Sequence, residues 1–142
     1  MSSTNYLILR TTAEMLPYYH LVIQMPYSFT IEQYERYLEE MIPNGYSQAA
    51  VLDGIDCIAL AGFWINTKLY CGKYVELDNV IVALGNQGRG IGKMLCRFVE
   101  EEALRQGCTT ALLDAYVENA AAHKFYFREG YKIRGYHFLK HL

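Results

Sequence analysis

The sequence predicts an α/β protein with a single mixed, mostly antiparallel sheet flanked by helices. Strand-like and helix-like stretches follow one another in the order β-α-α-β-β-β-α-β-α-β, and two of the strands flank an Asp-Gly pair that is typical of a hairpin. A further helix separates two strands, as in a right-handed crossover. At 142 residues, with 52% hydrophobic and 20% charged residues, we expect one globular domain over residues 1–142.

The first half of the chain is expected to supply a strand, two helices and a hairpin, at residues 5–10, 11–25, 30–42 and 47–65. The first strand is a short apolar run. The first helix has Thr12 as its candidate cap, and Pro17 is expected to bend it. The second helix has the stronger signal, because Thr30 and Gln33 match a capping box. The hairpin is centred on the Asp-Gly pair at 53–54.

The second half is expected to supply strands at 73–84, 109–117 and 131–139 and helices at 91–107 and 119–130. The first of these strands is expected to be long. Each helix ends in a glycine, the residue that most often terminates a helix. The helix at 91–107 also carries an apolar stripe at helical spacing, made of Met94, Leu95, Phe98, Val99 and Leu104.

Composition excludes several classes of function. The net charge of −2 and the pI near 6.1 argue against nucleic acid as a partner, which requires a basic face. The N-terminus lacks the pattern of a signal peptide, and the sequence has no apolar run of 18 residues, so we expect a cytoplasmic protein without a membrane span. The four cysteines are scattered without a C-x-x-C pair, which predicts reduced thiols and no metal site.

Residues 86–95, NQGRGIGKML, place three glycines between a predicted strand and a predicted helix. The free N–H groups and the dipole of a helix N-terminus attract anions, and Lys93 adds a full positive charge in the first turn. We therefore expect a ligand that carries phosphate.

Three phosphate-binding patterns compete for this loop. The P-loop pattern fails because Gln87 stands where its first glycine is required and Met94 where Ser or Thr must bind magnesium. The dinucleotide pattern fails because Lys93 occupies the place of its third glycine. The third pattern, (Q/R)-x-x-G-x-(G/A), is filled by residues 87–92. Here the sequence resembles the GNAT superfamily of N-acetyltransferases, whose loop wraps the pyrophosphate of acetyl-CoA.

A second signature of that superfamily, N-x-x-A-x-x-F-Y-x-x-x-G-(F/Y), matches residues 119–131. The resemblance covers about residues 70–135 and implies the acyl-CoA N-acyltransferase fold. It also implies that an acetyl group moves from acetyl-CoA to a primary amine by direct attack in a ternary complex, without a metal. No cysteine stands in either signature, which argues against a covalent acetyl-enzyme.

The resemblance implies roles for particular residues. Tyr126 corresponds to the general acid that protonates the leaving thiolate, and Glu76 to a strand glutamate that acts as general base in some members. Asp78, two residues further on the same strand face, and a water chain are alternatives for the base. The implied cofactor-binding residues are Val80, Ile81, Val82, Gln87, Gly88, Arg89, Gly90, Ile91, Gly92, Lys93, Asn119 and Tyr126.

The acceptor is expected to bind to residues 12–46, which hold six tyrosines (Tyr18, Tyr19, Tyr27, Tyr34, Tyr37 and Tyr46) and five glutamates (Glu14, Glu32, Glu35, Glu39 and Glu40). Aromatic faces and carboxylates suit a cationic amine, either a small molecule or an exposed peptide amine. Alternatively, the tyrosines fill the core and the glutamates form a solvated face. A different reading of the whole chain is a catalytically inactive acyl-CoA-binding sensor or interaction module. The sequence leaves open whether the protein is a monomer or a homodimer.

Overall fold

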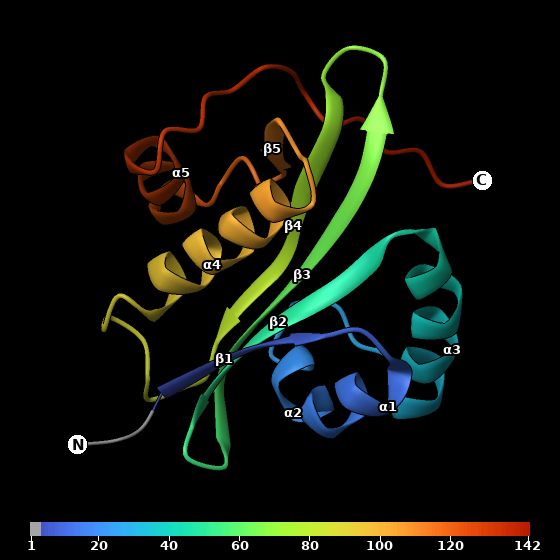
Figure 1. The fold of residues 1–142 in the computed structure, drawn as a ribbon, viewed down its shortest axis with the longest axis vertical. Helices are drawn as coiled ribbons and strands as arrows, with labels where there is room; N and C mark the ends of the chain where they lie inside the picture. The colour runs from blue at the N-terminus through green and yellow to red at the C-terminus, as the bar shows by residue number, and fades with distance from the viewer. Residues whose placement is uncertain (1–3) are drawn as a thin grey trace. The chain divides into compact units, whose positions relative to one another are not determined.

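The computed structural model describes residues 4–142 and contains two compact units, divided between Leu112 and Leu113. The strands, labelled in Figure 1, are β1 (Thr4–Leu9), β2 (Tyr46–Asp53), β3 (Asp56–Lys68), β4 (Gly72–Val82) and β5 (Thr110–Leu113). The helices are α1 (Thr12–Met15), α2 (Tyr19–Val22), α3 (Ile31–Met41), α4 (Ile91–Arg105) and α5 (Ala120–Arg128), with short 3-10 turns at Leu16–Tyr18 and Ile42–Asn44. The assignment of residues 1–142 to a single domain stays a prediction.

One sheet has the strand order β1-β2-β3-β4-β5, and each of its first three strand pairs is antiparallel. The predicted hairpin is confirmed: Asp53 pairs with Asp56, and Gly54 between them has φ +62°, a left-handed angle that favours glycine. β5 lies beside β4, and the Thr109 amide donates to the Lys73 carbonyl at the start of that pairing. The predicted mixed, mostly antiparallel sheet is therefore present.

The two faces of this sheet are covered by different helices (Figure 1). Side chains alternate between faces along a strand, so Tyr46, Gln48 and Ala50 of β2 point to one face. Tyr46 and Ala50 belong to the hydrophobic cluster that includes Met15, Leu21 and Leu38 of α1, α2 and α3. The short helices α1–α3 thus cover the face that carries Gln48.

α4 packs on the opposite face, against β3 and β4. Within the predicted apolar stripe, Leu95 and Val99 are buried, whereas Met94 and Leu104 are exposed. Phe98 packs against Tyr6 of β1 with ring centroids 5.3 Å apart. α4 therefore covers one face of β3 and β4, and α1–α3 cover the other face.

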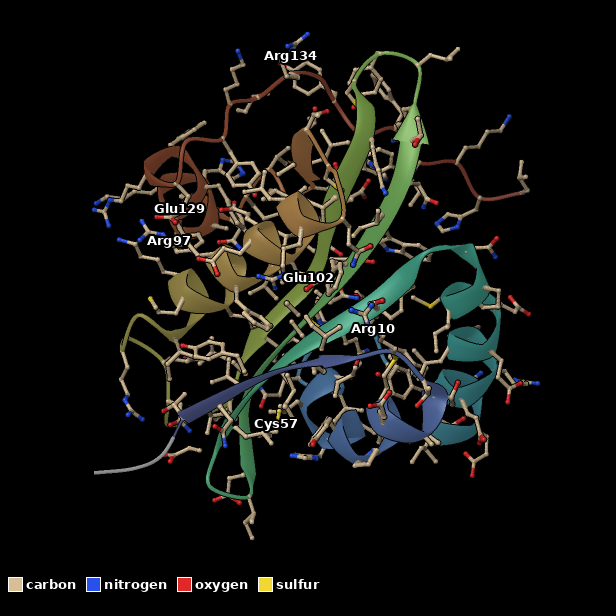
Figure 2. All side chains as sticks on the ribbon, in the orientation of Figure 1. Arg10, Cys57, Arg97, Glu102, Glu129 and Arg134 are labelled. Atoms are coloured by element: carbon tan, nitrogen blue, oxygen red, sulfur yellow. The ribbon has the colours of Figure 1, made fainter. Side chains whose placement is uncertain are left out.

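Glu102, on the buried side of α4, links that helix to the end of β1 (Figure 2). Its carboxylate accepts hydrogen bonds from Arg105 Nη2 at 2.8 Å and from Gln106 Nε2 at 2.9 Å, and Arg10 Nη2 lies 3.4 Å away. The hydrogen bonds from Gln106 and Arg105 lower the pKa of Glu102, because they stabilise the charged form.

The N-terminal helical segment differs from the prediction in its cap. The Thr11 hydroxyl, and not that of Thr12, accepts from the Glu14 amide, and Glu14 Oε1 accepts in return from the Thr11 amide. Thr11 is the cap because Glu14 stands three residues later and completes a capping box with it. Pro17 interrupts the helix as expected, within the 3-10 turn between α1 and α2. The predicted capping box of Thr30 and Gln33 is confirmed.

The predicted strand at 131–139 is wrong, since the structure assigns no strand within residues 131–142. The segment has the alternating composition of a strand, but a strand also needs a neighbour whose backbone groups pair with its own. Large apolar side chains consequently stay exposed there, at Ile133, Tyr136, Phe138 and Leu139. The predicted strand at 109–117 is shorter in the structure, where β5 ends at Leu113.

Within residues 4–142, every helix is too short or too polar to span a lipid bilayer. The same residues contain no group of three His, Cys, Asp or Glu side chains that could hold a metal ion. The four cysteines are free thiols, and burial raises the pKa of the Cys57 thiol to about 11.

Candidate functional site

The loop that carries the three glycines joins β4 to α4, and its backbone explains two of them. Gly88 has φ +78° and Gly90 has φ +74°, a left-handed region that other residues rarely adopt. A Cβ on either residue would have no atom within 4 Å, so the backbone angle alone requires glycine within the protein. Gly92 lies inside the helix, where a Cβ would meet only Val82 Cγ2 at 3.7 Å.

Gly90 is also the N-cap of α4 and supplies no side-chain hydrogen bond. The amides at the start of this 15-residue helix thus receive no acceptor from their cap, and such amides attract anions together with the helix dipole. The side chains of Arg89 and Lys93 are exposed beside them, and Arg89 Nη1 donates to Asn86 Oδ1 at 2.8 Å. This geometry suits the phosphate ligand expected from the sequence.

The two candidate bases lie on β4. Glu76 pairs with Trp64 and Asp78 with Gly62 on β3, so both carboxylates point to the face covered by α1–α3. Both residues are partly exposed, and Asp78 Oδ2 accepts from Trp64 Nε1 at 3.1 Å. The predicted shared orientation of Glu76 and Asp78 is confirmed.

A bulge follows Asp78 on β4. Gly62 pairs with Asp78 but Leu60 pairs with Ile81, so β4 has an extra residue in this interval, and Asn79 there has φ +57°. Tyr27 donates a hydrogen bond from its hydroxyl to Asn79 Oδ1. The three residues predicted to contact the cofactor arm, Val80, Ile81 and Val82, continue the strand from this bulge.

The Val82 carbonyl of this strand accepts a hydrogen bond from Gln24 Nε2 at 3.3 Å.

β5 pairs with the other end of β4. The bonds that join the start of β5 to β4 lie near Cys71 and Lys73, at the opposite end of β4 from Val82, and β5 ends at Leu113. The role of Val80–Val82 toward the cofactor stays a prediction.

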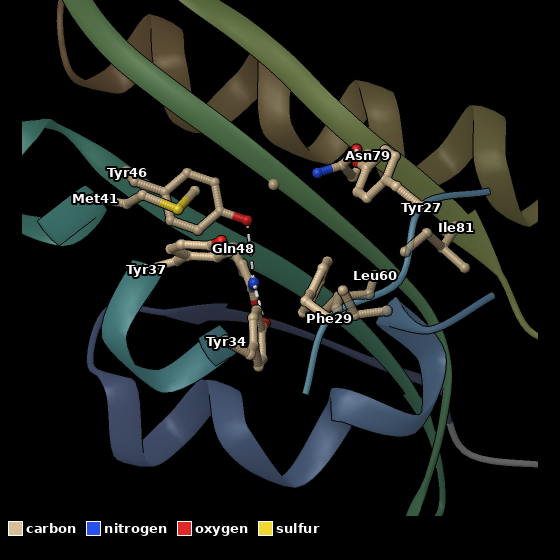
Figure 3. A pocket seen from close by; sticks show the side chains of 12 residues that line it. Tyr27, Phe29, Tyr34, Tyr37, Met41, Tyr46, Gln48, Leu60, Asn79 and Ile81 are labelled. Atoms are coloured by element: carbon tan, nitrogen blue, oxygen red, sulfur yellow. Dashed lines mark hydrogen bonds between the residues drawn. The ribbon is translucent and has the colours of Figure 1, made fainter. Parts of the chain in front are cut away.

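A cavity of about 220 Å³ lies on the same face of the sheet, within the first unit (Figure 3). Its walls are mainly aromatic and aliphatic, and none of its lining residues is charged. The lining consists of Val22, Tyr27, Phe29, Tyr34, Tyr37, Met41, Tyr46, Gln48, Leu60, Gly62, Asn79 and Ile81. The cavity therefore suits an uncharged or cationic organic group better than an anion.

Of the residues 12–46 that are expected to bind the acceptor, four tyrosines line this cavity and none of the glutamates does, and acceptor binding there stays a prediction. Four of the six tyrosines line the cavity, whereas Tyr18 and Tyr19 pack against the core. Glu14 belongs to the cap of α1, and the four glutamates of α3 are exposed outside the cavity lining. The glutamates of α3 form the solvated face that was the alternative reading.

Sequence reasoning missed Gln48, whose side chain lies in this cavity and is 2% exposed. Gln48 Nε2 donates to the Tyr34 hydroxyl at 2.8 Å and to the Tyr46 hydroxyl at 3.1 Å, as the dashed lines in Figure 3 show. Burial raises the pKa of both tyrosines, so both hydroxyls stay protonated at neutral pH. The available signal was that Gln48 is a polar residue on the same strand face as Ala50, within the largely apolar stretch 47–52.

The second unit holds the residues of the second signature. Asn119 caps α5, with its Oδ1 accepting from the Ala122 amide at 3.1 Å. Tyr126 lies on α5, and its ring packs edge-to-face against Phe125 and Tyr131. The Tyr131 amide donates to the Tyr126 carbonyl, which explains the spacing of the signature locally. The predicted contacts of Asn119 and Tyr126 with the cofactor stay predictions.

Comparisons with known proteins agree with this geometry. The model of the acetyltransferase (GNAT) family matches residues 15–131. Aminoalkylphosphonate N-acetyltransferase of Salmonella typhimurium is 29% identical over 101 residues, which are 70% of this chain and 65% of that protein, so the match spans less than two thirds of the relative's length.

Solved structures share the fold. The aminoglycoside N-acetyltransferase AAC(6')-Iy in complex with CoA superposes with a TM-score of 0.85 at 17% identity, covering 100% of this chain and 96% of the other. Glucosamine-6-phosphate N-acetyltransferase from Arabidopsis thaliana superposes with a TM-score of 0.73 at 22% identity, covering 98% of each chain.

Proposed function

Because the chain belongs to the GNAT family of acetyltransferases, we propose that it transfers an acetyl group from acetyl-CoA to a primary amine on a small molecule or an exposed peptide. The observation that carries the proposal is the glycine loop, which fills the family's pattern and ends at a helix N-terminus whose cap has no side chain to accept a bond from the first amides. The open space above Gly88 and Gly90 fits the close approach of a pyrophosphate.

In the proposed reaction, residues 87–93 hold the pyrophosphate and the backbone of Val80–Val82 holds the pantetheine arm. An N–H of that strand donates to the carbonyl oxygen of the thioester as negative charge develops on it. Acetyl-CoA supplies the activated acetyl group.

The amine must lose a proton before its lone pair can form the bond to the acetyl carbon. Glu76, or Asp78 on the same strand face, accepts this proton directly or through water. The carbon–sulfur bond then breaks, and the Tyr126 hydroxyl gives its proton to the departing thiolate. The acetylated nitrogen loses its second proton, which returns to the Tyr126 oxygen directly or through water. Asn119 contributes a contact to the cofactor in addition to its cap.

We place the acceptor in the cavity of Figure 3, on the strand face that also bears Glu76 and Asp78. Aromatic rings attract an ammonium group by about 0.5–2 kcal/mol, and nearby carboxylates raise its local concentration. The curated relative is named for aminoalkylphosphonates, which makes an amine with a phosphonate group the second candidate acceptor. The cavity lining favours the cationic amine, because it offers no basic side chain to a phosphonate.

The test is release of free thiol from acetyl-CoA with a panel of amines at low and high salt. The panel contains polyamines, amino acids, basic peptides, an amino-sugar phosphate and aminoalkylphosphonates. We expect turnover of cationic amines that weakens as salt screens the carboxylates. Turnover restricted to phosphonates or sugar phosphates would assign the second candidate. Coenzyme A binding in calorimetry without thiol release from any amine would instead indicate the inactive sensor.

A further inference from the structure

We propose that Gln48 selects the acceptor: its carboxamide oxygen accepts a hydrogen bond from a second N–H or O–H group of the amine substrate, apart from the amine that is acetylated. This inference rests on the proposed function and adds a requirement on the chemistry of the acceptor. Four observations carry it: the burial of Gln48, the missing partner of its oxygen, the fixed orientation of its amide, and its place in the cavity wall.

The oxygen of Gln48 lacks a partner. Gln48 Oε1 is the one buried side-chain oxygen or nitrogen among residues 4–142 that makes no hydrogen bond. Leaving a buried acceptor unpaired costs about 1–3 kcal/mol, and folded proteins rarely retain such a group. A ligand that donates to this oxygen removes the cost when it binds.

The two tyrosines fix the direction of the amide. Gln48 Nε2 uses its two hydrogens on the hydroxyls of Tyr34 and Tyr46, at 2.8 and 3.1 Å. These bonds hold the Gln48 amide between Tyr34 of α3 and Tyr46 of β2 (Figure 3), which fixes the direction of the buried carboxamide oxygen. A held acceptor loses less rotamer entropy on binding than a mobile one, which is the usual advantage of a preorganised site.

Gly62 makes room for the Tyr46 ring beside Gln48. Gln48 pairs with Gly62 on β3, so the position across the strand pair has no side chain. A Cβ on Gly62 would lie 2.4 Å from the Tyr46 hydroxyl, so glycine is required for Tyr46 to reach Gln48. Gln48, Tyr46 and Gly62 all line the cavity.

The remaining walls define the ligand that fits. Phe29 packs against the rings of Tyr27, Tyr34 and Tyr37, at centroid distances of 6.1, 5.6 and 6.2 Å. Such a cluster favours a cation or an aliphatic stem, and the lining has no basic group that would hold an anion. The matching acceptor is a short amine with a second ammonium or hydroxyl group at the other end of an aliphatic chain.

The experiment compares acceptors that differ only in that second group. Linear diamines, amino alcohols and n-alkylamines of equal chain length are offered as acceptors to the wild-type protein, to Gln48→Met and to Gln48→Glu. Methionine keeps the unbranched shape without a strong acceptor, whereas glutamate keeps an acceptor oxygen at this position. Thermal unfolding and the KM for acetyl-CoA check that each variant is folded and binds its co-substrate.

We expect the wild-type protein to prefer the diamine or the amino alcohol over the alkylamine by about 10- to 100-fold in kcat/KM, on the scale of a hydrogen bond to a buried acceptor. Gln48→Met should reduce this ratio to within about threefold, and Gln48→Glu should retain a preference for the diamine. An unchanged ratio in folded Gln48→Met would overturn the proposal. So would a wild-type protein that does not distinguish the two classes, a result that requires no variant to fold.

The outcomes distinguish a wrong function from a wrong role of Gln48. If no amine at all is acetylated, the proposed function is wrong. If alkylamines and diamines are both acetylated and the ratio does not depend on residue 48, the function stands and the role of Gln48 is refuted.

Discussion

Gly90→Ala should weaken coenzyme A binding by more than its effect on folding can explain. Gly90 has φ +74°, and an alanine held there costs roughly 1–2 kcal/mol. The alanine can relax that strain only by turning φ toward negative values, which re-aims the amides at the start of α4. Losing one hydrogen bond between such an amide and a charged phosphate costs about 1.5–3 kcal/mol, or roughly 10- to 100-fold in affinity.

The matched control is Gly107→Ala, just beyond the other end of α4. Gly107 has φ +88°, and a Cβ there would also meet no atom within 4 Å. The two substitutions therefore add the same methyl group to the same kind of backbone angle in open space. We expect similar losses of stability, on the order of 1–2 kcal/mol, but weaker coenzyme A binding only in Gly90→Ala.

The assay combines calorimetric titration with coenzyme A and denaturant unfolding of the wild-type protein and both variants. The reasoning is refuted if Gly90→Ala and Gly107→Ala bind coenzyme A equally well while both are folded. In that case the backbone angle at Gly90 serves only the fold, and the loop does not hold the pyrophosphate.

Four further substitutions test the remaining roles. Tyr126→Phe should lower kcat by on the order of 100-fold with little change in coenzyme A affinity, because it removes a proton donor and keeps the ring; a kcat within twofold of wild type in steady-state assays would leave Tyr126 a packing residue. Glu76→Gln should remove or shift the acidic limb of the kcat/KM pH profile while Asp78→Asn leaves it in place, and the reverse result assigns the base to Asp78. Glu102→Gln should lower the free energy of unfolding by about 1 kcal/mol at pH 7. Because the folded protein lowers the pKa of Glu102, this difference should shrink as pH falls below the ordinary value of 4.5, and a pH-independent difference in urea unfolding would contradict the ion-pair account.

Local signals predicted most of the first unit correctly. The capping box of Thr30, the Asp-Gly hairpin and the glycine loop each depend on residues within a few positions of one another, so the sequence contains the whole physical cause. The same holds for Asn119, whose bond to the Ala122 amide spans one helical turn. The family resemblance also rests on such short-range patterns.

Apart from the cap at Thr11, whose cause is local, the wrong prediction has a cause that is distant in sequence. The pattern at 131–139 alternates like a strand, yet pairing depends on the backbone of another segment, which composition does not reveal. The sequence left open whether the glutamates of α3 belong to an acceptor site or form a solvated face. In the fold they lie outside the cavity lining, because Tyr34 and Leu38 take the buried side of the helix.

The sequence by itself determined the Asp-Gly hairpin, the glycine loop between a strand and a helix, and the strand that carries Glu76 and Asp78. Only the tertiary structure revealed the cavity in which we place the acceptor. Gln48, Gly62 and Tyr34 lie on three separate elements, and strand register together with helix packing brings them to one cavity. The unpaired oxygen of Gln48 is a property of that assembly, since an acceptor becomes unsatisfied only once folding has removed water from it.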